Sequence, residues 1–135
     1  MNAEPEFRAS PAPVPVLRPL ESFAFDARFV AALPGDPLAD NQVRQVPDAC
    51  YTRVAPTPVT APRLLAWSDA LGAELGIARP RGADAPGVLA LAGNLVLPGM
   101  QPYAARYGGH QFGNWAGQLG DGRAIKLGEL IDAGG

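Results

Sequence analysis

The chain has 135 residues, which is enough for one small domain with a modest hydrophobic core. Its formal net charge of −2 supplies no basic field of the kind that holds nucleic acid, so no nucleic-acid partner is expected. A single cysteine, Cys50, and a single histidine, His110, exclude an internal disulfide and a metal centre built from His and Cys. Cys50 is expected to pack as a small hydrophobe.

Residues 1–19 are rich in proline and show no hydrophobic period, which predicts an extended or disordered arm. Glu4 and Glu6 argue against a secretory signal and against an acid-poor transit peptide. The sequence contains no apolar run near the ~20 residues that a membrane-spanning helix needs. We therefore expect a cytoplasmic protein with no membrane partner.

The first ordered segment is predicted at Leu20–Leu33, but its hydrophobic period is ambiguous. Phe23 and Phe25 alternate as in a strand, whereas Phe25, Phe29 and Leu33 repeat every four residues as in a helix. These apolar side chains are expected to anchor the fold. A turn-rich connector and then an edge strand, bounded by prolines, are predicted at Pro34–Gln45 and Val46–Ala55.

The main helix is predicted at Pro62–Leu75. Thr60 is placed to cap it, Pro62 suits its first turn and Gly76 marks its end. One face carries an apolar stripe that predicts burial in the core: Leu64, Trp67, Leu71 and Leu75.

A linker is predicted at Arg79–Gly87, where proline and glycine are frequent. The apolar segment Val88–Leu97 follows and is interrupted by Gly93-Asn94. It is consistent with a short helix that stops at this pair, or with two short buried pieces.

The glycine-rich stretch Tyr107–Leu130 is predicted to form a β-hairpin that turns at Asp121-Gly122. Both residues tolerate the positive φ of a type I′ turn, and the flanking strands are expected at Asn114–Leu119 and Arg123–Leu130. In the second strand, Ile125 and Leu127 alternate with Ala124 and Lys126 as in a half-buried strand.

Other side chains of this stretch are given structural roles. His110 is expected to fix the loop through hydrogen bonds to the backbone, with Phe112 and Trp115 anchoring the hairpin underneath. Glu129 is expected either to face solvent or to form a salt bridge with Lys126 or Arg123.

The same turn is a candidate anion site. Successive backbone N–H groups in such a turn point into a concavity, and Arg123 at its exit adds a planar cation suited to phosphate. The alternative is an ordinary tight hairpin with a solvated arginine, because a short Gly-x-Gly pattern is weak evidence by itself.

A longer string adds to this interpretation. Gly109-His110-Gln111-Phe112-Gly113, then Gln118 through Ile125, then Leu127-Gly128-Glu129 closely resembles the signature of the selenoprotein O family of kinase-like protein adenylyltransferases. Weaker similarity extends back through Ser22-Phe23 and Asn94–Tyr107.

The resemblance implies an α+β fold that forms the N-terminal part of a protein-kinase-like (pseudokinase) fold, with residues 20–135 as an incomplete nucleotide-binding lobe. It implies a transferase that uses ATP with Mg²⁺ or Mn²⁺ and attaches AMP to Ser, Thr or Tyr hydroxyls of protein substrates. Within this chain it assigns nucleotide binding to Gly120, Gly122 and Arg123.

The family's catalytic and metal-binding residues lie downstream of Gly-Asp-Gly-Arg, and Lys126 follows the loop too closely to be the phosphate-contacting lysine of a kinase-like site. We therefore expect an N-terminal fragment that supplies the ATP-binding loop, lacks metal ligands and is inactive alone. The alternative is a small non-catalytic module that binds an anion or a partner.

Overall fold

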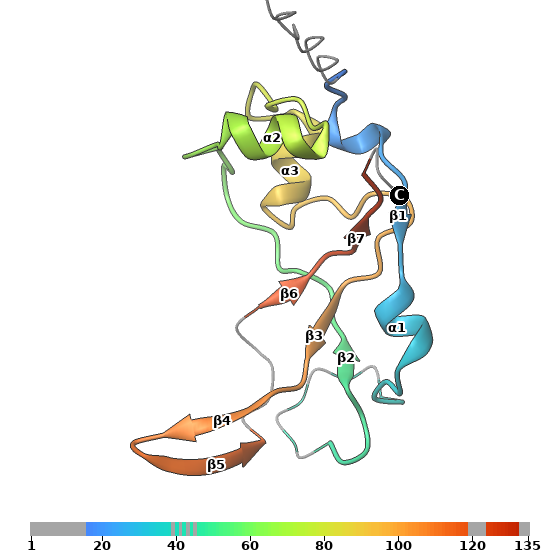
Figure 1. Cartoon of the computed structure of the whole chain (residues 1–135), viewed down its shortest axis with the longest axis vertical. Coiled ribbons are helices and arrows are strands. Elements are labelled where there is room, and N and C mark those ends of the chain that lie inside the picture. The colour runs from blue at the N-terminus through green and yellow to red at the C-terminus, as the bar shows by residue number, and fades with distance from the viewer. Residues whose placement is uncertain are drawn as a thin grey trace, which may run out of the picture.

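The computed structural model describes residues 16–38, 40, 42, 44, 46–118 and 124–132. Figure 1 shows an elongated molecule with helices at one end, short strands in the middle and a β-hairpin at the other end. Helices and antiparallel strand pairs are both present, so the predicted α+β class is confirmed.

The helical elements are short. They are η1 (Leu20–Ser22), α1 (Arg28–Ala32), α2 (Asp69–Leu75) and α3 (Pro86–Leu91). The strands are β1 (Phe25–Asp26), β2 (Tyr51–Arg53), β3 (Tyr103–Ala105), β4 (Gly108–Gln111), β5 (Asn114–Gln118), β6 (Ile125–Lys126) and β7 (Glu129–Leu130).

Strands distant in sequence pair with one another in the middle of the molecule. A three-stranded antiparallel sheet has the order β2-β3-β6, with Thr52 opposite Ala104 and Ala104 opposite Ile125. Strand β1 pairs separately with β7, and β4 pairs with β5. Strand β2 lies inside the predicted segment 46–55 and at the edge of its sheet, which confirms the edge-strand prediction.

The ambiguous segment 20–33 contains both kinds of structure. It is divided among η1, β1 and α1, and the carboxylate of Asp26 accepts a hydrogen bond of 2.7 Å from the N–H of Ala27 where the strand gives way to the helix. Phe23 and Val30 are buried as expected, whereas Leu33 is exposed.

The predicted helix at Pro62–Leu75 is too long, because α2 begins at Asp69 and is capped by Ser68 instead of Thr60. The Ser68 hydroxyl accepts a hydrogen bond of 3.3 Å from the N–H of Leu71. The Trp67 ring packs so closely on Gly72 that a Cβ there would lie 2.9 Å from it. In a continuous helix the side chains of residues 67 and 72 would point about 140° apart. The contact between Trp67 and Gly72 therefore requires extended backbone before Ser68.

Other features of the helical end follow the prediction more closely. Gly76 ends α2 in the left-handed region with φ of 71°. Of the two alternatives for residues 88–97, the short helix is the correct one, because α3 ends just before Gly93-Asn94. A hydrophobic cluster joins both helices to η1; its buried members are Leu20, Phe23, Ile77, Ala90 and Leu97. Trp67 and Leu75 pack against this cluster, but Leu71 is exposed, so the predicted apolar stripe is only partly in the core.

A second cluster lies between α1 and the three-stranded sheet. Val30, Tyr51 and Tyr103 are its buried members, and Phe29 stacks on Tyr103 with 4.9 Å between the ring centroids. Cys50 is partly buried against the same cluster, so its predicted role as a packed hydrophobe is confirmed. The Tyr51 hydroxyl donates a hydrogen bond of 2.7 Å to the carbonyl of Val30, which lies in the last turn of α1.

The connector between α1 and β2 is fixed by Asp36. Its carboxylate accepts hydrogen bonds from the N–H of Leu38, the hydroxyl of Thr52 and the guanidinium of Arg44. The hydrogen bond from Leu38 is the largest cause that lowers the pKa of Asp36 below its ordinary 3.8, followed by the bond from Thr52 and the charge of Arg44. Because the folded pKa is lowered, this carboxylate stabilises the fold above pH 3.8 and loses that effect as the pH falls through the lowered value.

We predict that Tyr51→Phe lowers the free energy of unfolding by about 1–3 kcal/mol, because the buried carbonyl of Val30 loses its hydrogen bond while the ring packing stays. Urea denaturation measures the change. Tyr107→Phe is the matched control, since the Tyr107 side chain is 49% exposed. Equal unfolding free energies for the two variants would contradict this role of Tyr51.

Candidate functional site

The sequence-predicted site residues Gly120, Gly122 and Arg123, with the proposed turn Asp121-Gly122, lie outside the described residues. The structure describes the strands on either side of them. Strand β5 ends at Gln118, and strand β6 begins at Ile125. The two strands belong to different sheets, because β5 pairs with β4 whereas β6 pairs with β3.

The predicted pairing of the strands before and after the glycine-rich loop is therefore wrong for the described residues. The hairpin that the structure contains joins β4 to β5 and turns at Phe112-Gly113, with Gln111 opposite Asn114. Both turn residues have positive φ, 50° for Phe112 and 82° for Gly113, as a type I′ turn requires. The Asn114 amide donates to the Phe112 carbonyl at 3.4 Å and helps to hold this turn.

Aromatic side chains on this hairpin face solvent, which corrects the expectation that they anchor it underneath. Phe112 is fully exposed and Trp115 is 63% exposed. The Trp115 indole lies over Gly108, where a Cβ would come within 2.7 Å of the ring. His110 meets Trp115 edge to face, with the ring centroids 5.1 Å apart. The described contact of His110 is thus with a ring and not the expected one with the backbone.

Strand β6 carries the chain away from the glycine-rich loop as an edge strand of the three-stranded sheet. Ile125 and Lys126 are both exposed, so the half-buried strand predicted here is wrong. The Lys126 ammonium lies 5.7 Å from the centroid of the Tyr103 ring, within cation–π range. Its antiparallel pairing places Lys126 opposite Tyr103 and Ile125 opposite Ala104.

Glu129 has a role that the sequence did not indicate. Its Oε1 accepts a hydrogen bond of 2.9 Å from the backbone N–H of Phe29, 100 residues earlier in the chain. That N–H is among the first of α1, which has no side-chain cap of its own. A carboxylate at a helix N-terminus is also favoured by the helix dipole. Glu129 therefore fixes the strand after the loop to α1 and is not the solvent-facing residue that was one expectation. No salt bridge joins it to Lys126 among the described residues, and Arg123, the other predicted partner, lies outside them.

Glu129 also affects the electrostatics of the aromatic cluster. Burial is the larger cause that raises the pKa of the Tyr103 hydroxyl above its ordinary 10.0, and the negative charge of Glu129 raises it further. Both effects disfavour the phenolate.

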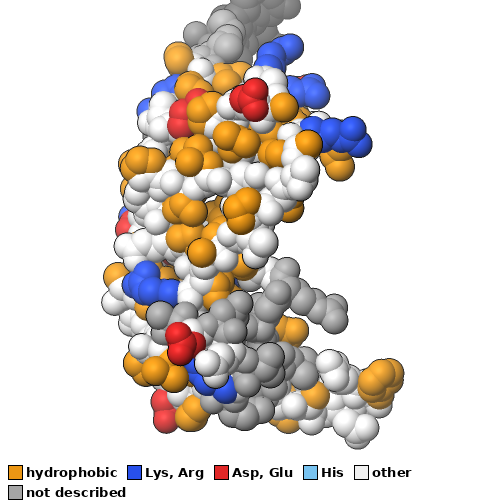
Figure 2. Space-filling model, turned by 180° about the vertical axis from the view of Figure 1, so that it is seen from behind, with side chains coloured by type: hydrophobic (Ala, Val, Ile, Leu, Met, Phe, Trp, Pro, Cys, Tyr) orange, Lys and Arg blue, Asp and Glu red, His pale blue; other side chains and the backbone are white. Residues whose placement is uncertain are grey.

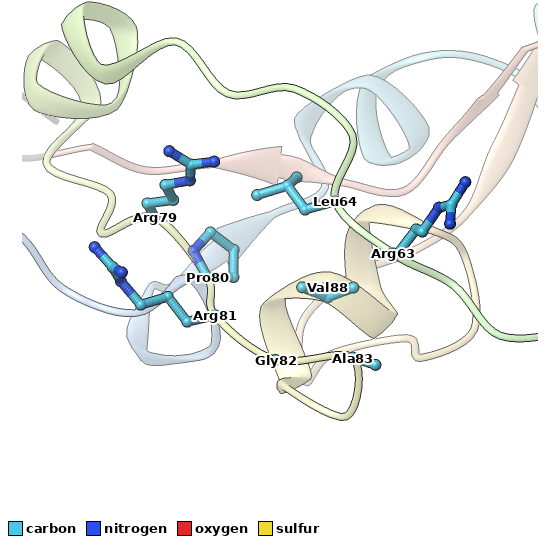
Figure 3. Close-up of a pocket in the computed structure, with 8 residues that line it drawn as sticks. All are labelled: Arg63, Leu64, Arg79, Pro80, Arg81, Gly82, Ala83 and Val88. Carbon is cyan, nitrogen blue, oxygen red and sulfur yellow. The ribbon is translucent and has the colours of Figure 1, made fainter.

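A cavity of about 460 Å³ lies at the helical end of the molecule (Figure 3). Three arginines line it, one from the extended segment before α2 and two from the loop between α2 and α3: Arg63, Arg79 and Arg81. Sequence reasoning interpreted residues 79–87 only as a linker. The run Arg79-Pro80-Arg81-Gly82 was the signal that could have indicated this cavity.

Two further properties of the described residues bear on function. They contain no group of three or more His, Cys, Asp or Glu side chains that could hold a metal ion. None of the helices in the described part of the chain has the length and apolar character needed to cross a membrane.

We predict that Glu129→Gln lowers the pKa of Tyr103, because the neutral amide can still accept from Phe29 while the negative charge disappears. The pKa stays above 10.0, since burial remains. NMR titration of the labelled Tyr103 ring measures this. Glu21→Gln is the control, because Glu21 lies on η1 and is not a cause of the Tyr103 shift. An unchanged Tyr103 pKa in Glu129→Gln would refute the assignment.

Comparison with known proteins identifies relatives of this chain. Proteins named protein nucleotidyltransferase YdiU are similar to this chain. The one from Nitrosospira multiformis is 65% identical over 119 residues, which cover 88% of this chain and 21% of that protein. The one from Aromatoleum aromaticum is 55% identical over 116 residues, which cover 86% of this chain and 22% of that protein. The chain thus spans about a fifth of the length of the curated relatives it matches.

The family described as protein adenylyltransferase SelO matches residues 39–135, a range that includes Gly120, Gly122 and Arg123. The resemblance found in the sequence is thereby confirmed. Because this family match covers well over half of the residues of the chain, the chain belongs to the protein adenylyltransferase SelO family.

Proposed function

We propose that this chain is the N-terminal part of a cytoplasmic protein nucleotidyltransferase that transfers AMP from ATP to Ser, Thr or Tyr hydroxyls of other proteins. In this proposal, residues 20–135 form part of a kinase-like nucleotide-binding lobe. The observation that carries the proposal is the family match over 39–135, which contains the entire glycine-rich string, together with 65% identity to a named nucleotidyltransferase.

The proposed role of the chain is to bind the phosphates of ATP. Backbone N–H groups at Gly120 and Gly122 and the guanidinium of Arg123 would supply the donors. The anchoring of the flanking strands supports this role. On one side Gln118 lies opposite Gly108, and on the other Ile125 lies opposite Ala104. Each end of the loop therefore starts from a hydrogen-bonded strand, and a loop positioned by such a scaffold is a common location for binding residues.

The metal ligands are assigned elsewhere. Because the described part of this chain has no suitable carboxylate cluster, we infer that the ligands for Mg²⁺ or Mn²⁺ lie in a region that corresponds to the remaining length of the relatives. The ion would neutralise phosphate charge during transfer. In the reaction, the acceptor hydroxyl oxygen bonds to the α-phosphorus of ATP, the bond from that phosphorus to the bridging oxygen breaks, and the hydroxyl proton and pyrophosphate are released.

We predict that residues 1–135 alone transfer no AMP. One phosphate-binding loop without metal-holding carboxylates lacks the charge stabilisation that nucleotidyl transfer requires. Incubation with α-labelled ATP, Mg²⁺ or Mn²⁺ and a protein acceptor should give background incorporation, while the complete gene product under the same conditions is the positive control. Transfer by the 135-residue chain would contradict the assignment of catalysis to other residues.

We predict that Arg123→Ala in the complete protein weakens ATP binding roughly tenfold or more, because a charge-assisted contact contributes about 1.5–3 kcal/mol. Arg123→Lys should recover only part of the affinity, since lysine keeps the charge but lacks the planar fork. Calorimetric titration measures both. Arg28→Ala is the control, because Arg28 in α1 is exposed and pairs with Asp26 at the end of β1. A folded Arg123→Ala variant that binds ATP normally would instead support the alternative, in which Arg123 is a solvated arginine on an ordinary hairpin.

A further inference from the structure

The arginine-lined cavity is separate from the elements that flank the glycine-rich loop. It lies beside α2 and α3, at the end of the molecule opposite the β4–β5 hairpin (Figure 1). In Figure 3, Arg79 and Arg81 lie on one side and Arg63 lies on the other, with Leu64, Pro80 and Val88 between them, and the side chains of Arg63 and Arg81 extend outward in opposite directions. Figure 2 shows basic side chains projecting from this end of the molecule, and these are arginines because the single lysine, Lys126, lies on β6.

The three guanidinium groups have no partner within the described residues. Arg63, Arg79 and Arg81 take part in none of the hydrogen bonds or ion pairs found there, whereas Arg28 and Arg44 each pair with an aspartate. No carboxylate is among the residues that line the cavity. Three like charges around one concavity repel one another, and a bound anion would relieve this repulsion.

The backbone on both sides of the cavity is restricted, whereas the arginine side chains are exposed. Pro62 precedes Arg63, and Pro80 separates Arg79 from Arg81; proline fixes φ at both places. Gly82, with φ of 91°, turns the chain directly after Arg81. The buried Val88 and the partly buried Leu64 and Pro80 give the cavity an apolar floor, and its volume is in the range of small-molecule sites.

We propose that this cavity binds a small molecule that carries a diphosphate group. Arginine forks match phosphate oxygens in pairs, and these exposed side chains without partners can turn from the two sides of the cavity toward adjacent phosphates of one ligand. A diphosphate carries more negative charge than a single phosphate and neutralises three guanidinium groups better. The apolar floor accommodates an organic part of the ligand. This site is independent of the ATP site proposed at Arg123.

Titration of inorganic pyrophosphate into the complete protein at constant ionic strength, followed by calorimetry, tests the proposal. We expect saturable binding that weakens at least tenfold in the double variant Arg79→Ala/Arg81→Ala and in Arg63→Ala. The double variant Arg79→Lys/Arg81→Lys should recover only part of the affinity, because lysine lacks the bidentate fork. Thermal melts confirm that each variant is folded.

Two control variants distinguish binding in this cavity from a net-charge effect and from binding at the glycine-rich loop. Arg28→Ala removes one exposed arginine outside the cavity and should bind pyrophosphate normally. If Arg28→Ala lost as much pyrophosphate affinity as the cavity variants, net charge alone would explain the effect and the proposal would be overturned. Arg123→Ala should retain this binding event, and loss confined to Arg123→Ala would overturn it in favour of the glycine-rich loop. Absence of saturable binding, or unchanged binding in both cavity variants, would also overturn it. None of these outcomes depends on AMP transfer.

Discussion

The contact of three aromatic rings, Phe29, Tyr51 and Tyr103, is the interaction on which the middle of the molecule depends. The rings come from α1, β2 and β3, so their packing joins a helix to two strands that are otherwise far apart in the chain. The hydroxyl of Tyr51 reaches the carbonyl of Val30 and satisfies a polar group at the end of α1. Because Gly35 has no side chain, the Tyr51 ring can lie where a Cβ would be 2.6 Å away.

This aromatic cluster also determines how the segment after the glycine-rich loop is held. Strand β6 pairs with β3 next to Tyr103, and Glu129 binds the backbone of Phe29. Both attachments therefore use the residues that form the cluster. A disturbance of the ring packing would be transmitted to the exit of the proposed phosphate-binding loop, even though none of the three rings belongs to that loop.

Local sequence signals were sufficient where one residue decides the backbone conformation. The end of α2 at Gly76 and the end of α3 before Gly93-Asn94 follow from glycine's tolerance of positive φ. The beginning of α2 has a local signal in the Ser68 cap, but Thr60 and Pro62 offer a competing start, and the packing of Trp67 over Gly72 decides between the two. The turn at Phe112-Gly113 was missed because phenylalanine rarely adopts positive φ.

The residues of the candidate site could be predicted from sequence, because a family is recognised by its sequence motif. The arrangement of these residues in space could not. The surroundings of the site depend on contacts between distant segments. Glu129 meets Phe29 across 100 positions, and Arg63 approaches Arg79 and Arg81 from a different segment. Hydrophobic period and turn chemistry act over a few residues and contain no information about such contacts.

The exposed Trp115 has a spectroscopic consequence. The chain contains two tryptophans, and Trp67 is packed against the cluster of the helical end whereas Trp115 is 63% exposed on β5. Their indoles therefore experience different polarity, so Trp115 contributes the longer-wavelength emission and is more accessible than the partly buried Trp67 to a dissolved quencher. Since Trp115 stands on the strand that leads into the glycine-rich loop, its fluorescence offers a built-in optical reporter for events at that loop.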